Sequence, residues 1–212
     1  MLNAEFEDAF SELASKFGLR QFQFHTPPAT SWLRIHRPEK FGDDLSSFRQ
    51  TVVETNRRQE PVSGVEKGVA GLGIRGIVPM MVEGRHWGSV EFGFSLGDSF
   101  FEQFKTDTGL DISLALKENN RLELFSSTLG DSLVASTTQL DSALHNDPQT
   151  STITLDEKPY ALYSQALQDF SGERIGVMTL FTDRSEYVNR YEQALFQLTM
   201  IILGFLVLGG LV

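Results

Sequence analysis

One pattern occurs twice along the chain, and this repeat limits the possible folds more than any other feature. Residues 78–104 read VPMMVEGRHWGSVEFGFSLGDSFFEQF, and residues 164–191 read SQALQDFSGERIGVMTLFTDRSEYVNRY. Each stretch reads as a strand, a glycine-containing turn, a second strand, an acidic residue and then a helix with aromatic residues. The pairs Gly84/Gly88 and Gly172/Gly176 have the same spacing. Two copies of one small unit would account for the length of the chain, although any two β-hairpins share part of this pattern.

The segments around this repeat predict an α/β fold of the α+β kind, with antiparallel hairpins. Apolar residues from Leu2 to Phe17 recur at steps of three and four, which is typical of an amphipathic helix. The glycine-rich residues 61–76 are predicted to form a loop that leads into a strand. The other predicted strands are 21–25, 32–36, 77–82, 87–94, 112–116, 121–125, 159–167 and 174–182; the predicted helices are 45–59 and 98–105, with a helix or loop over 133–144.

The C-terminal segment Ala194–Val212 carries no charged residue. A run of about 20 apolar residues matches the length needed to cross a membrane as a helix, so we expect a transmembrane helix over 194–212. A buried core helix is the alternative. No signal peptide precedes the first helix. We therefore expect a fragment of a longer protein, with an upstream transmembrane helix outside this sequence; a cytosolic domain with a C-terminal tail anchor is the other possible topology.

Composition and motifs exclude several classes of function. The formal net charge of −10 argues against a nucleic-acid partner, because phosphate binding needs a basic surface. The chain has no cysteine, which excludes a disulfide framework, thiol catalysis and thiolate metal sites. The sequence contains no G-x-S-x-G elbow, HExxH pair or nucleotide-binding P-loop. We expect no metal, no cofactor and no catalytic activity in this segment.

The candidate ligand site begins at the stretch WLRIH, residues 32–36. Alternate side chains of a strand share a face, so Trp32, Arg34 and His36 are predicted to lie on one face and Leu33 and Ile35 on the other. If other polar residues join this row, guanidinium groups could hold a small carboxylate through paired hydrogen bonds, with Trp32 as an apolar wall. The residues expected to converge with the row are Arg49, Arg75 and Glu91, where Glu91 would take a ligand amine or an internal arginine.

The same residues could instead form internal ion pairs with no ligand. Arg34 could pair with Asp43 or Asp44, and Arg49 or Arg75 could pair with Glu66 or Glu91. Asp43 or Asp44, just before Leu45, is also predicted to cap the N-terminus of a helix. The histidines outside the strand, His25, His86 and His145, are expected at the surface.

Two tandem hairpin-rich modules between a long first helix and a closing apolar helix resemble the double-Cache extracytoplasmic sensor domains of bacterial chemoreceptors, sensor histidine kinases and diguanylate cyclases. The stretch LRIHRPEKFGDDLSSFR, with GVEKGVAGLGIRGIVPMMVEGRHWGSVEFGF, is similar to the membrane-distal module of one such subfamily. QALQDFSGERIGVMTLFTDRSEY resembles the membrane-proximal module. The resemblance implies tandem PAS-like modules: a signalling helix over 1–19, a ligand-binding module over 20–110, a second module over 111–183, and a helix over 184–212 that enters the membrane.

This resemblance implies a homodimeric sensor in the bacterial inner membrane with its soluble part in the periplasm. It would bind a small carboxylate, amino acid or other anion and pass a conformational change to a cytoplasmic output module. The alternative is a membrane-anchored docking or dimerisation module without a small-molecule ligand. A closed polar pocket in the first module favours the sensor, whereas an exposed apolar patch favours docking.

Overall fold

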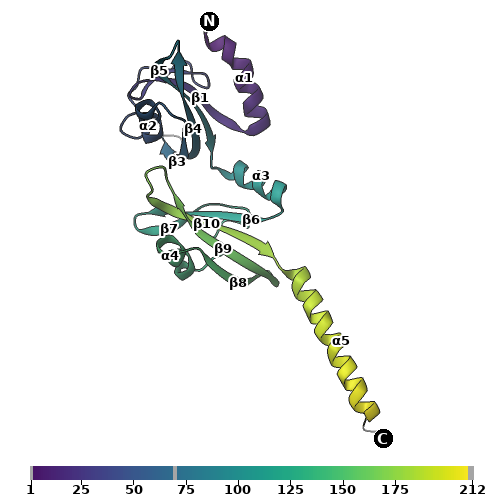
Figure 1. Ribbon diagram of the computed structural model, residues 1–212. Helices are drawn as coiled ribbons and strands as arrows, with labels where there is room; N and C mark the ends of the chain where they lie inside the picture. Colours follow the sequence, from purple (N-terminus) through teal and green to yellow (C-terminus); the bar gives the residue numbers. More distant parts are fainter. Residues whose placement is uncertain (1, 69–70, 210–212) are drawn as a thin grey trace.

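The structure, a computed structural model, describes residues 2–68 and 71–209, with side chains over 5–68 and 71–205. It is an α+β fold with two five-stranded antiparallel sheets, which follow one another along the chain (Figure 1). The first sheet contains β1 (Leu19–Thr26), β2 (Thr30–Arg34), β3 (Val62–Gly68), β4 (Gly71–Val82) and β5 (Arg85–Ser95). The second contains β6 (Asp111–Glu118), β7 (Arg121–Ser127), β8 (Gln149–Leu155), β9 (Lys158–Gln168) and β10 (Arg174–Asp183).

A helix covers each face of the first sheet, whose strand order is β2-β1-β5-β4-β3. On one face, α1 (Leu2–Phe17) packs its Phe6 and Phe10 against an apolar layer that includes Phe22 and Phe24 of β1. Figure 1 shows α1 lying alongside this sheet. On the other face lies α2 (Gln50–Arg58), whose Val52 belongs to the same buried cluster as Ile77 of β4. Phe6, Phe10 and Leu13 of the predicted apolar stripe therefore pack as the periodicity indicates, whereas Phe17 is exposed and the side chain of Leu2 lies outside the described residues.

The second sheet has the equivalent strand order, β7-β6-β10-β9-β8. One face packs against α4 (Thr137–His145), which buries Leu140 and Ala143 in a cluster with Leu162 and Phe181. The other packs against α3 (Asp98–Thr108), whose Phe101 contacts a cluster that also contains Leu72 of the first sheet. This cluster connects the two sheets. The chain ends in α5 (Ser185–Gly209), which projects away from the second sheet (Figure 1).

The glycines of the repeat occupy matching places in the two sheets. Gly84 and Gly172 lie in the β4–β5 and β9–β10 turns with φ of 75° and 85°. Gly88 and Gly176 lie where a neighbouring strand approaches closely: a Cβ on Gly88 would be 1.9 Å from the carbonyl oxygen of His25, and one on Gly176 would be 2.3 Å from that of Ala115. The shared spacing in the sequence thus corresponds to a shared packing requirement.

Several predicted elements need correction. Residues 61–76 are mostly strands β3 and β4 rather than a loop. Strand β8 was not predicted at all. The predicted helix over 45–59 begins only at Gln50, because Leu45 is held to the first sheet by its N–H donating to the carbonyl of Ala29 at 2.9 Å.

The expected transmembrane helix over 194–212 is not found. Within the described part of the chain, no helix combines the length and apolar character needed to cross a membrane. The backbone of α5 is described as far as Gly209, and residues 210–212 lie outside the described residues.

Candidate functional site

A row of polar side chains crosses the α2-facing side of the first sheet. The strand register places Gln23 of β1 between Arg34 of β2 and Glu91 of β5. A second row pairs Gln21 with Gly93 and Gly93 with Arg75 of β4. On the opposite side, Phe22, Phe24 and Phe92 face α1. The alternation of β1 therefore separates an apolar face from a polar one, and the polar face is buried under α2 and the residues before it.

Glu91 lies at the centre of this buried network and has no solvent exposure. Its carboxylate accepts hydrogen bonds from Gln23 Nε2 at 2.7 Å and Arg75 Nη1 at 3.1 Å, and it lies 3.2 Å from Arg49 Nη1. Burial raises the pKa of Glu91, but the guanidiniums of Arg49 and Arg75 outweigh it, and the net shift is downward. Glu91 is therefore a charged internal partner of the arginines, and its oxygens are not free for a ligand amine.

Arg34 is buried and pairs with Asp43 through two parallel hydrogen bonds, Nη1 to Oδ1 at 2.7 Å and Nη2 to Oδ2 at 2.8 Å. Its Nη1 also donates to the carbonyl of Lys40 at 2.7 Å, and its Nε donates to Gln23 Oε1 at 3.1 Å. The hydrogen bonds from Arg34 lower the pKa of Asp43. This pair holds the 35–45 segment against the sheet, as the ion-pair interpretation of the sequence anticipated.

Glu66 of β3 performs the capping role that was predicted for an aspartate. Its carboxylate accepts from Thr51 N at 3.1 Å and Thr51 Oγ1 at 2.8 Å in the first turn of α2, and it lies 3.6 Å from Arg49 Nη1. Asp43 and Asp44 do not cap this helix, because it starts after them; Asp44 accepts instead from Ser46 N at 2.9 Å. The prediction of an aspartate cap is wrong for this reason.

His25 is buried in the network, contrary to the expectation of a surface position. Its Nε2 lies 3.4 Å from Glu91 Oε2, and its Nδ1 lies 3.4 Å from Ser89 Oγ. Burial lowers the pKa of His25 to about 4, so the ring is neutral at pH 7. His145 is exposed as predicted, and His86 is partly buried.

Trp32 and His36 do not share a row with Arg34. The β1–β2 register shifts between Phe24 and His25, which leaves Trp32 without a cross-strand partner. Trp32 is half exposed, and its ring meets Phe24 edge-on at 6.3 Å between centroids. The strand ends at Arg34, and His36 places Nδ1 3.2 Å from the Phe22 carbonyl oxygen; burial lowers the pKa of His36.

Two cavities open on the polar face of the first sheet. The one beside Arg34, of about 240 Å³, is lined by four cationic side chains and a single carboxylate. The one beside Arg75, of about 310 Å³, is lined by two arginines and by no acidic side chain. Buried N–H groups of Arg49 (Nη1) and Arg75 (Nε) have no hydrogen-bond acceptor among the described residues. The charged groups of the first cavity are Arg34, Arg37, Lys40, Arg49 and Asp43; those of the second are Arg20 and Arg75.

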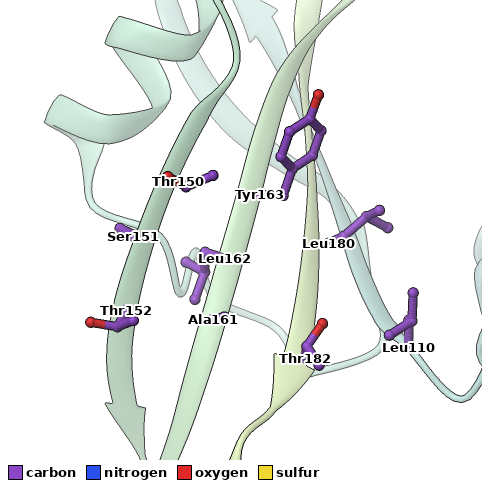
Figure 2. A pocket seen from close by; sticks show the side chains of 9 residues that line it. All are labelled: Leu110, Thr150, Ser151, Thr152, Ala161, Leu162, Tyr163, Leu180 and Thr182. Atoms are coloured by element: carbon purple, nitrogen blue, oxygen red, sulfur yellow. The ribbon is translucent and has the colours of Figure 1, made fainter.

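The polar row under α4 on the second sheet consists of neutral side chains. Under α4, Gln139 donates to Ser164 Oγ at 3.2 Å and accepts from Ser151 Oγ at 2.7 Å, and Ser164 bonds Thr179 at 2.9 Å. On the opposite face of this sheet, a cavity of about 490 Å³ crosses β8, β9 and β10, where Figure 2 shows threonine, leucine and tyrosine side chains spread along the strands. No carboxylate, amine, guanidinium or imidazole lines it. The ionisable network therefore belongs to the first sheet.

Metal binding has no support in the described residues, because they contain no group of three or more His, Asp or Glu side chains placed to hold an ion. The arrangement of charges is suited to binding. Its cations are fixed by buried partners on one side and face a cavity on the other, which favours recognition of an anionic group.

Comparison with known proteins identifies both the sequence family and the fold. A family model described as the double sensory domain of two-component sensor kinases matches residues 2–187. No curated protein sequence matches the chain. The ligand-binding domain of the Campylobacter jejuni chemoreceptor Tlp3 superposes with a TM-score of 0.51 in its L-norvaline complex and 0.50 in its 4-methylisoleucine complex; identity is 9%, and the match covers 86% of this chain and 72% of that one. This likeness shows the fold.

An extracellular ligand-binding receptor from Desulfohalobium retbaense also matches, with 14% identity and a TM-score of 0.48. The match covers 84% of this chain but 35% of that receptor, so the chain spans about a third of its length.

Proposed function

Because the chain belongs to the double sensory domain family of two-component sensor kinases, we propose that it is an extracytoplasmic sensor that binds a small anion in its first module. The proposed module covers residues 20–110, and the second covers 111–183. The observation that carries the proposal is the charge of the two cavities. In a chain of net charge −10, cations predominate in both linings. A cationic cavity in an acidic protein selects anions by both attraction and hydrogen bonding.

The proposed ligand is a carboxylate or other anion without an ammonium group. The Tlp3 structures named above contain amino acids, whose ammonium group needs an acceptor such as a carboxylate. Here both oxygens of Asp43 accept from Arg34, and Glu91 is fully buried among its arginines. Each carboxylate is thus already paired with a guanidinium, which makes it a weaker partner for an amine. Arg34, Arg49 and Arg75 would contact the anion, and His36, Arg37 and Lys40 would line the entrance.

The proposed signal starts at Arg49, which joins the cavity to Glu66 and so to the first turn of α2. An anion that draws Arg49 toward the cavity would weaken its attraction to Glu66 on β3. Strand β3 in turn contacts the β9–β10 turn, where the N–H of Phe170 donates to the Val65 carbonyl at 2.8 Å. Strand β10 leads directly into α5. The ligand would shift an existing equilibrium between two arrangements of this path, by no more than its difference in affinity for them.

The proposed setting is a homodimer at the bacterial inner membrane, with the sensor modules in the periplasm and α5 leading to the membrane. The apolar side chains of α5 support this setting, since those from Leu195 to Phe205 are exposed to a large extent. Such exposure favours burial against lipid or a second helix.

A docking module remains the second candidate function, because one end of the first sheet exposes a group of large apolar side chains. These belong to β2, β4 and β5: Trp32, Val78, Met81, Val82 and Trp87. A partner protein that covers this group would need no anion.

Calorimetric titration with acetate, succinate, phosphate, sulfate and glycine tests the proposal. We expect one or more of the anions to bind and glycine not to bind. Arg37→Ala and Lys40→Ala should each weaken binding about threefold to tenfold without unfolding the protein, since neither residue contacts a buried carboxylate. Lys16→Ala on α1 is the matched control, and its affinity should be unchanged. Binding of glycine alone, or equal affinity in all three variants, would contradict an anion site here.

A further inference from the structure

The side chain of Gln21 lies between the two cationic cavities and lines both. Its Oε1 accepts hydrogen bonds from Arg75 Nη1 and from Arg49 Nη2, the latter at 3.0 Å. Arg49 lines one cavity and Arg75 the other. A single neutral amide oxygen is therefore shared by two guanidiniums, although an anionic oxygen would satisfy them better.

The two guanidiniums each keep unused hydrogen-bonding capacity on the buried side. Arg49 and Arg75 are 5% and 3% exposed. Within the described chain Arg75 Nε has no hydrogen-bond acceptor, and Arg49 Nη1 forms ion pairs with Glu91 at 3.2 Å and Glu66 at 3.6 Å without hydrogen-bond geometry. A buried donor without an acceptor costs free energy, and a charged donor costs more than a neutral one. Both cavities thus contain a fixed cation that lacks part of its acceptor set.

A glycine on the neighbouring strand allows Gln21 and Arg75 to approach each other. Gly93 lies between Gln21 and Arg75 in the strand register. A Cβ at this position would lie 2.7 Å from Arg75 Nη1 and 3.1 Å from Gln21 Cβ. The absence of a side chain at residue 93 therefore lets Gln21 and Arg75 meet across β5, and the Gln21 amide separates the two cavities.

We propose that the ligand carries two acidic groups, one in each cavity, and that it displaces the Gln21 amide. One acidic group bonds Arg34 and Arg49, the other bonds Arg75 and Arg20, and the Gln21 amide leaves its place between the guanidiniums. This inference rests on the proposed anion site and adds the number of acidic groups and the residue that they displace. A monocarboxylate fills one cavity and leaves the other cation with only the amide.

Calorimetric titration of the full 212-residue chain with matched acids tests the number of groups. The probes are succinate against butyrate and glutarate against pentanoate, which have equal carbon counts. In the pair whose dicarboxylate has the length that fits both cavities, we expect the dicarboxylate to bind at least about tenfold more tightly than the monocarboxylate. A second charge-assisted hydrogen bond contributes a free energy of this size.

Substitutions of Gln21 test the residue. Gln21→Ala removes the competing amide, and dicarboxylate affinity should rise a few-fold. Gln21→Glu places a carboxylate between the guanidiniums, and dicarboxylate affinity should fall about tenfold or more. Gln103→Glu, which adds the same charge on the exposed side of α3, should leave affinity unchanged. If Gln21 had only a structural role, both of its substitutions would weaken dicarboxylate binding.

The outcomes separate this inference from the proposed function. Equal affinity for monocarboxylates and dicarboxylates, or weaker binding in Gln21→Ala, overturns the two-group ligand and leaves the anion site standing. If neither these acids nor the inorganic anions bind a folded chain, the proposed function itself fails, and this inference fails with it.

Discussion

Gly64 of β3 and Phe170 of the β9–β10 turn are in direct contact across the two sheets. A Cβ on Gly64 would lie 3.0 Å from both Cβ and Cδ2 of Phe170. The next residue of β3, Val65, accepts the Phe170 N–H at 2.8 Å. Asp169 stabilises the turn, because its Oδ1 accepts from Ser171 N at 2.9 Å and Glu173 N at 3.0 Å. The second module thus contacts the strand that carries Glu66.

This contact predicts the effect of a methyl group at Gly64. Gly64→Ala should destabilise the protein by about 1–2 kcal/mol, because Phe170 or β3 must shift to make room. Phe170→Ala should remove most of the penalty, so a double-mutant cycle measured by urea unfolding should give a coupling of about 1 kcal/mol. Gly76→Ala is the control, since no atom lies within 4 Å of its added Cβ. Additive effects of the two substitutions would show that the contact is not tight.

The repeated glycines predict a matched pair of severe variants. In Gly88→Ala and Gly176→Ala, the new Cβ would meet a backbone carbonyl at 1.9 Å and 2.3 Å, and neither strand can move without breaking its ladder. We expect each to cost about 3 kcal/mol or more, measured by chemical unfolding, while Gly76→Ala changes stability far less. A mild effect at either position would mean that the two hairpins are not packed alike.

His25 predicts a pH dependence of stability. Its pKa is about 4 in the folded chain, below the ordinary histidine value of 6.5, because burial disfavours the charged ring. Since the unfolded chain binds the proton more readily, the contribution of His25 to stability is complete above pH 6.5. It declines as the pH falls from 6.5 toward 4, by at most about 1.4 kcal/mol per pH unit.

Urea unfolding between pH 4 and 7.5 measures this slope. His25→Gln should flatten the curve in the pH 4–6.5 window, whereas His145→Gln, at an exposed position, should follow the wild-type curve. If His25→Gln leaves the slope intact, other groups cause the dependence.

Glu91 predicts the cost of breaking the buried network. Glu91→Gln removes the carboxylate that Arg49 and Arg75 share and leaves two buried guanidiniums without their central partner. We expect a loss of about 3–5 kcal/mol in the free energy of unfolding. Glu12→Gln, which breaks an exposed pair with Lys16, should change it by less than about 1 kcal/mol. A small effect at Glu91 would mean that water replaces the carboxylate.

The residues of the candidate site were predictable in part. Arg34, Arg49, Arg75 and Glu91 do converge, because the alternation of each strand was readable and the register brings them together. Trp32 was misplaced because the register shift at Phe24 moves it out of the row. Gln21 and His25 were missed as site residues, since an uncharged or neutral side chain in a short alternating strand looks the same whether it is buried or exposed. Glu66 was predicted only as a possible ion-pair partner of an arginine, because the glycine-rich sequence around it was interpreted as a loop and not as strand β3.

The sequence by itself determined the β4–β5, β6–β7 and β9–β10 hairpins, the amphipathic first helix and the repeated glycine spacing, because these depend on neighbours a few residues apart. Only the tertiary structure decided which cation meets which carboxylate. Arg34 and Asp43 lie close in the chain, but Glu91 of β5 draws its partners from three other elements: Gln23 of β1, Arg75 of β4, and Arg49 at the start of α2. Such pairing depends on register and on helix position, which are set by the packing of the whole module. A buried carboxylate cannot be hydrated, so it pairs with the cations that this packing places beside it.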